Sequence, residues 1–93
     1  MEKKYKIDFN DYSFMDEEGE FCGTLVYKRY GKKNNLLANI DLDDGRKIIT
    51  AAYSDDNDYL GLKEIEVDSR VKAAFERTKS GMIRLKEICN ITE

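Results

Sequence analysis

The segment from residue 36 to residue 53 constrains the fold of this chain more than any other part of the sequence. It begins with LLANIDL, which is apolar at positions 36, 38, 40 and 42 and polar at 39 and 41. Such alternation is typical of a half-buried β-strand. The residues DDG at 43–45 suit a type I turn followed by a glycine in the left-handed conformation. With Leu42 opposite Arg46, Ile40 faces Ile48 and Asp41 faces Lys47, which predicts a hairpin with a return strand at 47–53.

The chain before this hairpin predicts two more strands. Residues 21–30 contain TLVY, a run with strong sheet propensity. Residues 31–35 have the composition of a loop and join that strand to the hairpin. The alternating segment 5–9 predicts a first strand. Together the four strands predict an antiparallel meander, with a long acidic connection at 10–20.

The chain after residue 53 begins with a turn at 54–58 and a short strand at 62–67. Residues 69–79 then fit two structures. The first is a helix, because Val71, Ala74, Phe75 and Thr78 have the spacing i, i+3, i+4, i+7. Asp68 would cap this helix and Gly81 would end it.

The second structure for this region is another hairpin. The residues TKSGM at 78–82 repeat the layout of LDDGR at 42–46, with glycine again in fourth place. If Thr78 lies opposite Met82, the register pairs Phe75 with Leu85, Glu76 with Arg84 and Val71 with Cys89. We favour this hairpin, because a valine at position 71 spoils the helix start signal and because the alternating residues 82–85 need a partner strand.

These elements predict one all-β domain over residues 1–93. The six to seven short strands would form a small antiparallel barrel or a strongly curved sheet, similar in style to an oligonucleotide/oligosaccharide-binding (OB) fold. If residues 69–79 are helical, the fold is instead α+β, with one helix on an antiparallel sheet.

The composition argues against an enzyme. The chain has no histidine, which removes imidazole acid/base catalysis and His-ligated metals. Cys22 and Cys89 are far apart and form no C-x-x-C motif, so we expect two reduced, buried thiols. Neither acidic run fits a calcium loop, because the run from Asp41 has Arg46 in place of the sixth-position glycine, and the run from Asp56 has Gly61 there but Leu60 at the fifth, ligand position. No phosphate-binding loop is present. We therefore expect no catalytic residues, no metal and no cofactor.

A ribbon of alternating aromatic and basic residues could bind nucleic acid. On a strand and its loop, tyrosines can stack on bases while lysines and arginines neutralise phosphates. The structural alternative places Tyr27 in the core and uses Lys28 to protect an edge strand. The candidate nucleic-acid-binding residues are Tyr27, Lys28, Arg29, Tyr30, Lys32 and Lys33.

The acidic connection carries a second candidate surface. It combines aromatic side chains with a run of carboxylates, and exposed aromatics on such a surface would suit a protein partner. The structural alternative is that the aromatics fill the core. The candidate protein-binding residues are Tyr12, Phe14, Asp16, Glu17 and Glu18.

The sequence thus favours a non-catalytic accessory or adaptor domain that binds a protein partner. The alternative is sequence-tolerant binding of single-stranded nucleic acid through residues 27–33. No apolar run is long enough to span a membrane, so we expect no membrane partner and a cytoplasmic location. The excess of lysine over arginine, 11 to 5, suits an AT-rich bacterial coding sequence.

Overall fold

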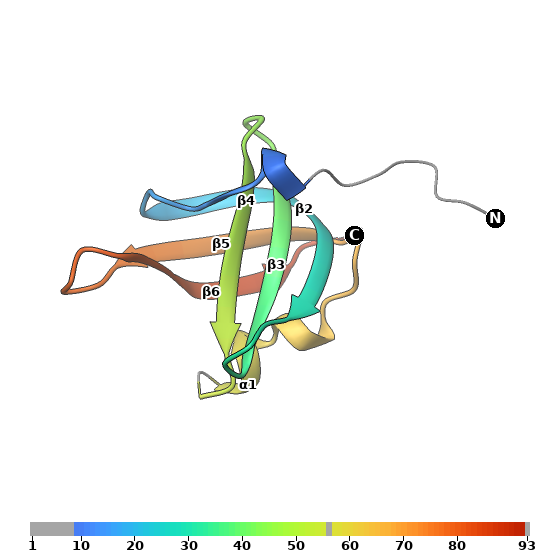
Figure 1. The fold of residues 1–93 in the computed structure, drawn as a ribbon. Coiled ribbons are helices and arrows are strands. Elements are labelled where there is room, and N and C mark those ends of the chain that lie inside the picture. The colour runs from blue at the N-terminus through green and yellow to red at the C-terminus, as the bar shows by residue number, and fades with distance from the viewer. Residues whose placement is uncertain (1–8, 56, 93) are drawn as a thin grey trace.

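The computed structural model describes residues 9–55 and 57–92, which form one mixed, curved sheet of six strands (Figure 1). The strands are ordered β1-β4-β3-β2-β5-β6, and every neighbouring pair is antiparallel except β1 and β4, which run parallel. The predicted all-β fold with a curved sheet is confirmed, and the sheet does not close into a barrel. In chain order the elements are the 3₁₀-helix η1 (Phe9–Asp11), β1 (Ser13–Phe14), β2 (Gly19–Tyr30), β3 (Asn35–Leu42), β4 (Lys47–Tyr53), α1 (Asn57–Leu60), the 3₁₀-helix η2 (Leu62–Glu64), β5 (Arg70–Arg77) and β6 (Ile83–Asn90).

The hairpin of β3 and β4 has the predicted register. Ile40 lies opposite Ile48, and Asp41 lies opposite Lys47. The turn closes through a hydrogen bond from the Gly45 amide to the Leu42 carbonyl, 3.0 Å long, and Gly45 has a φ of 99°. A left-handed glycine of this kind allows the turn to follow the right-handed twist of the two strands.

The long strand β2 belongs to both halves of the sheet. Its first half pairs with β5, from Gly19 opposite Phe75 to Thr24 opposite Arg70. Its second half pairs with β3, and a bulge lies between Leu25 and Tyr27. Bulges bend a strand and increase its twist, and in Figure 1 β5 and β6 run across the direction of β3 and β4.

The hairpin of β5 and β6 is also confirmed, so the helical alternative for residues 69–79 is wrong. Phe75 pairs with Leu85 and Glu76 pairs with Arg84, as predicted. The predicted pair of Val71 and Cys89 is wrong by one residue. A bulge between Ala74 and Phe75 shifts the register beyond it, which places Lys72 opposite Cys89.

The short strand predicted for 62–67 is wrong. Residues Leu62–Glu64 form η2, which follows Gly61 in the left-handed conformation with a φ of 81°. Leu62 is fully buried in the core. The strand predicted for 5–9 lies outside the described residues except for Phe9, which belongs to η1.

The concave side of the curved sheet encloses the hydrophobic core. The largest fully buried side chains are Leu25, Ile40, Leu62 and Val71, which come from β2, β3, η2 and β5. Burial of each such side chain contributes about 1.5–3 kcal/mol relative to its exposed state. Because the sheet is open, part of this core is reached from outside between β4 and β6.

Candidate functional site

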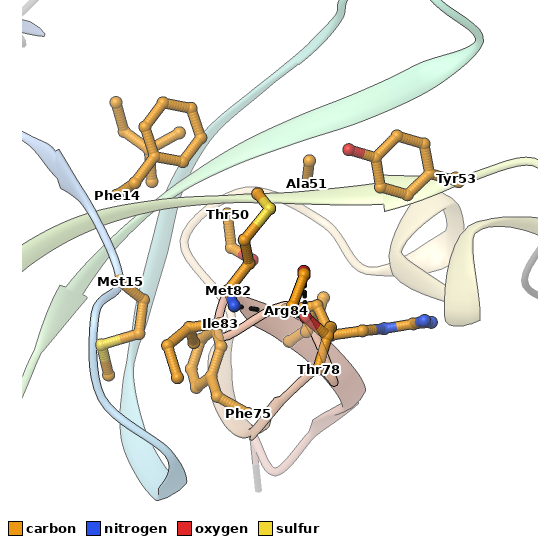
Figure 2. Close-up of a pocket in the computed structure, with 13 residues that line it drawn as sticks. Phe14, Met15, Thr50, Ala51, Tyr53, Phe75, Thr78, Met82, Ile83 and Arg84 are labelled. Atoms are coloured by element: carbon orange, nitrogen blue, oxygen red, sulfur yellow. Dashed lines mark hydrogen bonds between the residues drawn. The ribbon is translucent and has the colours of Figure 1, made fainter.

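A cavity of about 330 Å³ lies where the curved sheet fails to close. One wall is formed by β4 and by the chain at β1, and the other by β5, β6 and the turn between them (Figure 2). Met15 and Leu85 are buried at its base, with 7% and 2% of their surface exposed. The cavity therefore continues the hydrophobic core to the surface.

Three large apolar side chains stand exposed around this cavity. Phe14 is 65% exposed, Met82 is 68% exposed and Tyr53 is 46% exposed. Figure 2 shows Met82 extending from the β5–β6 turn toward β4, with Phe14 and Tyr53 on the opposite wall. Exposed apolar side chains that gather around a hollow mark interaction sites in soluble proteins. We call this region the β4–β6 groove, and it consists of the cavity and these three rim residues.

Phe14 is held at the groove because the residues before and after it in the sequence are both anchored to the sheet. On one side, the Met15 amide donates to the Ile49 carbonyl at 3.3 Å and extends the parallel pairing of β1 with β4. On the other, the Tyr12 hydroxyl donates to an Asp41 carboxylate oxygen at 2.5 Å. Burial, followed by this hydrogen bond, raises the pKa of Tyr12 above its ordinary value. Tyr12 thus holds the β1 segment in place and, unlike Phe14, does not line the cavity.

Two of the acidic candidates make ion pairs, one with the β3–β4 turn and one with the end of β5. Glu17 accepts from Arg46 at 2.7 Å, and Glu18 lies 3.6 Å from the Arg77 guanidinium. Asp16 is exposed. The ion pairs of the acidic segment therefore fasten the β1–β2 connection to the rest of the sheet. Of the five predicted protein-binding residues, only Phe14 lines the groove.

The side chain of Lys28, a predicted nucleic-acid-binding residue, bonds to other parts of this chain. Its ammonium group donates to the main-chain carbonyls of Leu62, Lys63 and Ile65, at 3.3, 3.1 and 2.5 Å. These carbonyls belong to η2 and to the residue that follows it. Tyr27 is also half-buried, opposite Asn39.

The other ribbon residues are more accessible. Tyr30 is 60% exposed and meets Tyr59 edge-on, with ring centroids 5.9 Å apart. It lines a hollow of about 210 Å³ together with Arg29 and Lys63. Lys32 and Lys33 are exposed on the loop between β2 and β3. The structure therefore keeps part of the predicted ribbon together and adds Lys63 to it.

The acidic and basic segments lie at opposite ends of β2. The carboxylates of residues 16–18 precede its first residue, and the basic ribbon occupies its last residues and the following loop. Figure 1 shows these two ends of β2 on different sides of the molecule.

Sequence reasoning missed three residues at these sites, Tyr53, Met82 and Lys63. Tyr53 and Met82 reach the groove only because the sheet curves until β4 and β6 approach each other. Lys63 joins the ribbon through η2, whose helical geometry was not predicted. Met82 did carry a local signal, since a large apolar residue directly after a tight turn is rarely needed for the turn itself.

The remaining expectations concern metals, thiols and membranes. Within residues 9–55 and 57–92, no cluster of three or more His, Cys, Asp or Glu side chains is arranged to hold a metal. Cys22 and Cys89 are free thiols, but only Cys22 is partly buried; Cys89 is exposed, contrary to the expectation of two buried thiols. Cys89 lies in the edge strand β6 directly after the buried Ile88, so its side chain points to the opposite, exposed face. None of the helices described has the length and apolar character to cross a membrane.

Comparison with known proteins adds no further information about the site. No family model matches the sequence, no curated protein matches it, and no solved structure matches the fold.

Proposed function

We propose that this protein is a non-catalytic adaptor domain that binds a protein partner through the β4–β6 groove. The observation that carries this proposal is the gathering of Phe14, Tyr53 and Met82 around one apolar cavity. Keeping such side chains in water is unfavourable, and a partner that covers them recovers about 25 cal/mol for each Å² removed from water. Aromatic residues and methionine are also enriched at protein interfaces.

The chemistry of the groove supports binding rather than catalysis. The side chains with polar groups among its lining residues are Thr50, Tyr53, Thr78, Ser80 and Arg84. No carboxylate from the described part of the chain lines the cavity. A general base or a nucleophile–base pair is most often built on a carboxylate or an imidazole at such a position.

The proposal is tested by truncating the rim. The protein and its Phe14→Ala and Met82→Ala variants are immobilised and exposed to nuclease-treated lysate of the source organism, and the captured proteins are quantified by mass spectrometry. We expect both variants to lose about tenfold or more of one specific partner, since buried aromatic and apolar anchors dominate interface energies. Val67→Ala is the matched control, because Val67 is 43% exposed and does not line the cavity. Equal capture by all four proteins would contradict the proposal.

Single-stranded nucleic acid is the second candidate ligand. It is favoured by the hollow in which the exposed Tyr30 lies beside Arg29 and Lys63. It is weakened by Lys28, whose ammonium group is already bound by three carbonyls. We therefore rank this function below protein binding.

We also propose that the protein acts in a bacterial cytoplasm. Two free cysteines suit a reducing compartment, and the lysine-rich composition suits an AT-rich bacterial gene. Fractionation of the source cells tests the location.

A further inference from the structure

We propose that the β4–β6 groove binds an extended segment of its partner as an added β-strand along the open edge of β4. The segment would place an apolar side chain in the cavity and an acidic side chain near the β5–β6 turn. This inference rests on the proposed function and specifies the kind of partner that the groove accepts.

The hydrogen-bond register of β4 shows which of its main-chain groups face the open edge. In an antiparallel pair, alternate residues direct both main-chain groups toward the partner strand. Leu42 bonds across the hairpin to Arg46, so Ile48 and every second residue after it face β3. The main-chain groups of Ile49, Ala51 and Tyr53 therefore point away from β3, toward the open edge.

The parallel strand β1 occupies only the first part of this edge. It pairs with Ile48 and Ile49, and the Met15 amide bonds to the Ile49 carbonyl. That bond confirms the direction deduced from the register. Beyond it, the N–H and C=O groups of Ala51 and Tyr53 have no hydrogen-bond partner among the residues that the structure describes. Such a row of unpaired groups is a template for another strand.

The cavity lies directly beside this edge of β4. Ala51 and Tyr53 themselves line it, together with Ile83 and Leu85 of β6. Alternate side chains of a strand point to opposite faces of the sheet. A segment paired with Ala51 and Tyr53 would therefore direct one side chain in two into the apolar cavity.

Charge also bears on the segment. Residues 70–86, which supply the other wall of the groove, contain six basic residues and one acidic residue. Four of the basic residues already form ion pairs, Arg70 with Asp43, Lys72 with Glu20, Arg77 with Glu18 and Arg84 with Glu76. Lys79 is exposed on the turn between Thr78 and Ser80, both of which line the cavity. Figure 2 shows the Arg84 side chain extending to the Tyr53 side of the groove. Lys79 at the turn is thus complementary to a carboxylate that the segment carries beside its apolar residue.

The experiment begins with a library of random eight-residue peptides displayed on phage and selected on the immobilised 93-residue chain. We expect the enriched peptides to carry one large apolar residue with Asp or Glu within two positions. Enrichment of basic peptides, or no enrichment over the Phe14→Ala variant, would overturn the proposal.

The best peptide is then synthesised with a single N-methyl group at each position in turn. Because only alternate amides of an added strand bond to β4, N-methylation should weaken binding about tenfold or more at every second position and little at the others. In the protein, the amide resonances of Ala51 and Tyr53 should shift and become protected from hydrogen exchange. An even response to N-methylation, or unchanged Ala51 and Tyr53 amides, would exclude strand addition.

A protein variant gives an independent measurement. Ala51→Pro removes one edge donor and leaves the bonds to β3 in place, because the Ala51 amide points outward. It should weaken the peptide about tenfold, while Val67→Ala binds normally. If Ala51→Pro does not fold, the N-methyl series still decides the question.

The two proposals fail in different ways. If partner capture depends on Phe14 and Met82 but not on the Ala51 amide, the groove binds a partner without strand addition, and only this inference is overturned. If partner capture is unchanged in the Phe14→Ala and Met82→Ala variants, the proposed function itself fails. Protection of Ala51 in the absence of peptide, with a dimer in sedimentation, would show that a second copy of the chain occupies the edge and would also overturn this inference.

Discussion

The ammonium group of Lys28 in β2 lies 2.5 Å from the main-chain carbonyl oxygen of Ile65. The same group also donates to the carbonyls of Leu62 and Lys63. The last carbonyls of a helix have no partner within the helix and need one from elsewhere. Lys28 provides a donor for Lys63 and Ile65 and shares the Leu62 carbonyl with the Ile65 amide, across a sequence separation of 34 to 37 residues. It thereby fastens η2 to the sheet.

The first prediction follows from this contact. Lys28→Met keeps the apolar stem and removes the charged donor, so we expect the free energy of unfolding to fall by about 1–3 kcal/mol. Urea denaturation measures it. Lys32→Met is the matched control, because Lys32 is exposed on the loop, and its effect should stay within about 0.5 kcal/mol. Equal effects of the two substitutions would show that the contacts of Lys28 contribute little to stability.

The second prediction compares two glycines, one that leaves no space for a Cβ atom and one that has a positive φ. A Cβ atom at Gly23 would lie 2.9 Å from the Cα of Leu42 and still closer to the Asp41 carbonyl, because β3 passes directly against β2 there. Gly81 has open space around it but a φ of 93°. We expect Gly81→Ala to cost about 1–2 kcal/mol from its conformation alone.

Gly23→Ala should cost more, about 3 kcal/mol or above, because main-chain atoms cannot move aside as a flexible side chain can. Thermal unfolding of both variants against the unchanged protein gives the ranking. A Gly23→Ala variant as stable as Gly81→Ala would mean that the two strands separate easily at this point.

The third prediction concerns alkaline pH and Tyr12. Its pKa is raised in the folded protein, first by burial and then by the hydrogen bond to Asp41. The unfolded chain therefore loses this proton first, near the ordinary tyrosine pKa of about 10. The stabilisation is complete below that pH and is lost as the pH rises above it.

Tyr12→Phe should accordingly lower the free energy of unfolding at neutral pH by about 1 kcal/mol and make its decline above pH 10 less steep. Denaturation at a series of pH values between 7 and 11 measures both effects. Tyr53→Phe serves as control, since Tyr53 is exposed at the rim of the groove. If both variants change the pH dependence of the free energy of unfolding equally, Tyr12 does not have the predicted role.

The parts of the fold that the sequence predicts are those encoded locally. Both hairpins have a turn of defined residue type and a register that follows from it, and both were found. The bulge beside Phe75 was not predictable in this way, because nothing in the residues near position 74 distinguishes a bulge from regular pairing.

Contacts between distant segments explain the remaining differences. Asn39 reads as an exposed position in an alternating strand, yet it is only 2% exposed because Tyr27 and Ile49 flank it from the neighbouring strands. Lys28 reads as a surface charge until η2 supplies its carbonyls. The groove likewise depends on how far the sheet curves, which no local pattern specifies.

The fourth prediction separates the two candidate ligands at the basic ribbon. If single-stranded nucleic acid binds there, a base stacks on Tyr30, and Tyr30→Ala loses about 1–3 kcal/mol of affinity. Lys32→Ala and Lys33→Ala should each weaken binding modestly. Each should also reduce the slope of log affinity against log salt by about 0.7, because each removes one phosphate contact on a single strand. In the adaptor function these three substitutions leave the protein partner bound, while Phe14→Ala does not.

Titration of a labelled, mixed-sequence oligonucleotide at low salt is the direct measurement, and the structure sharpens it at Lys28. Since the ammonium group of Lys28 already has three carbonyl partners, Lys28→Met should change the salt slope much less than Lys32→Ala, even where it lowers stability. Lys63→Ala, which removes a cation from the hollow beside Tyr30, should behave like Lys32→Ala. Non-specific nucleic-acid binders usually reach dissociation constants of about 0.1 mM or lower, so an absence of saturable binding in that range would eliminate this function and leave the β4–β6 groove as the binding site of the protein.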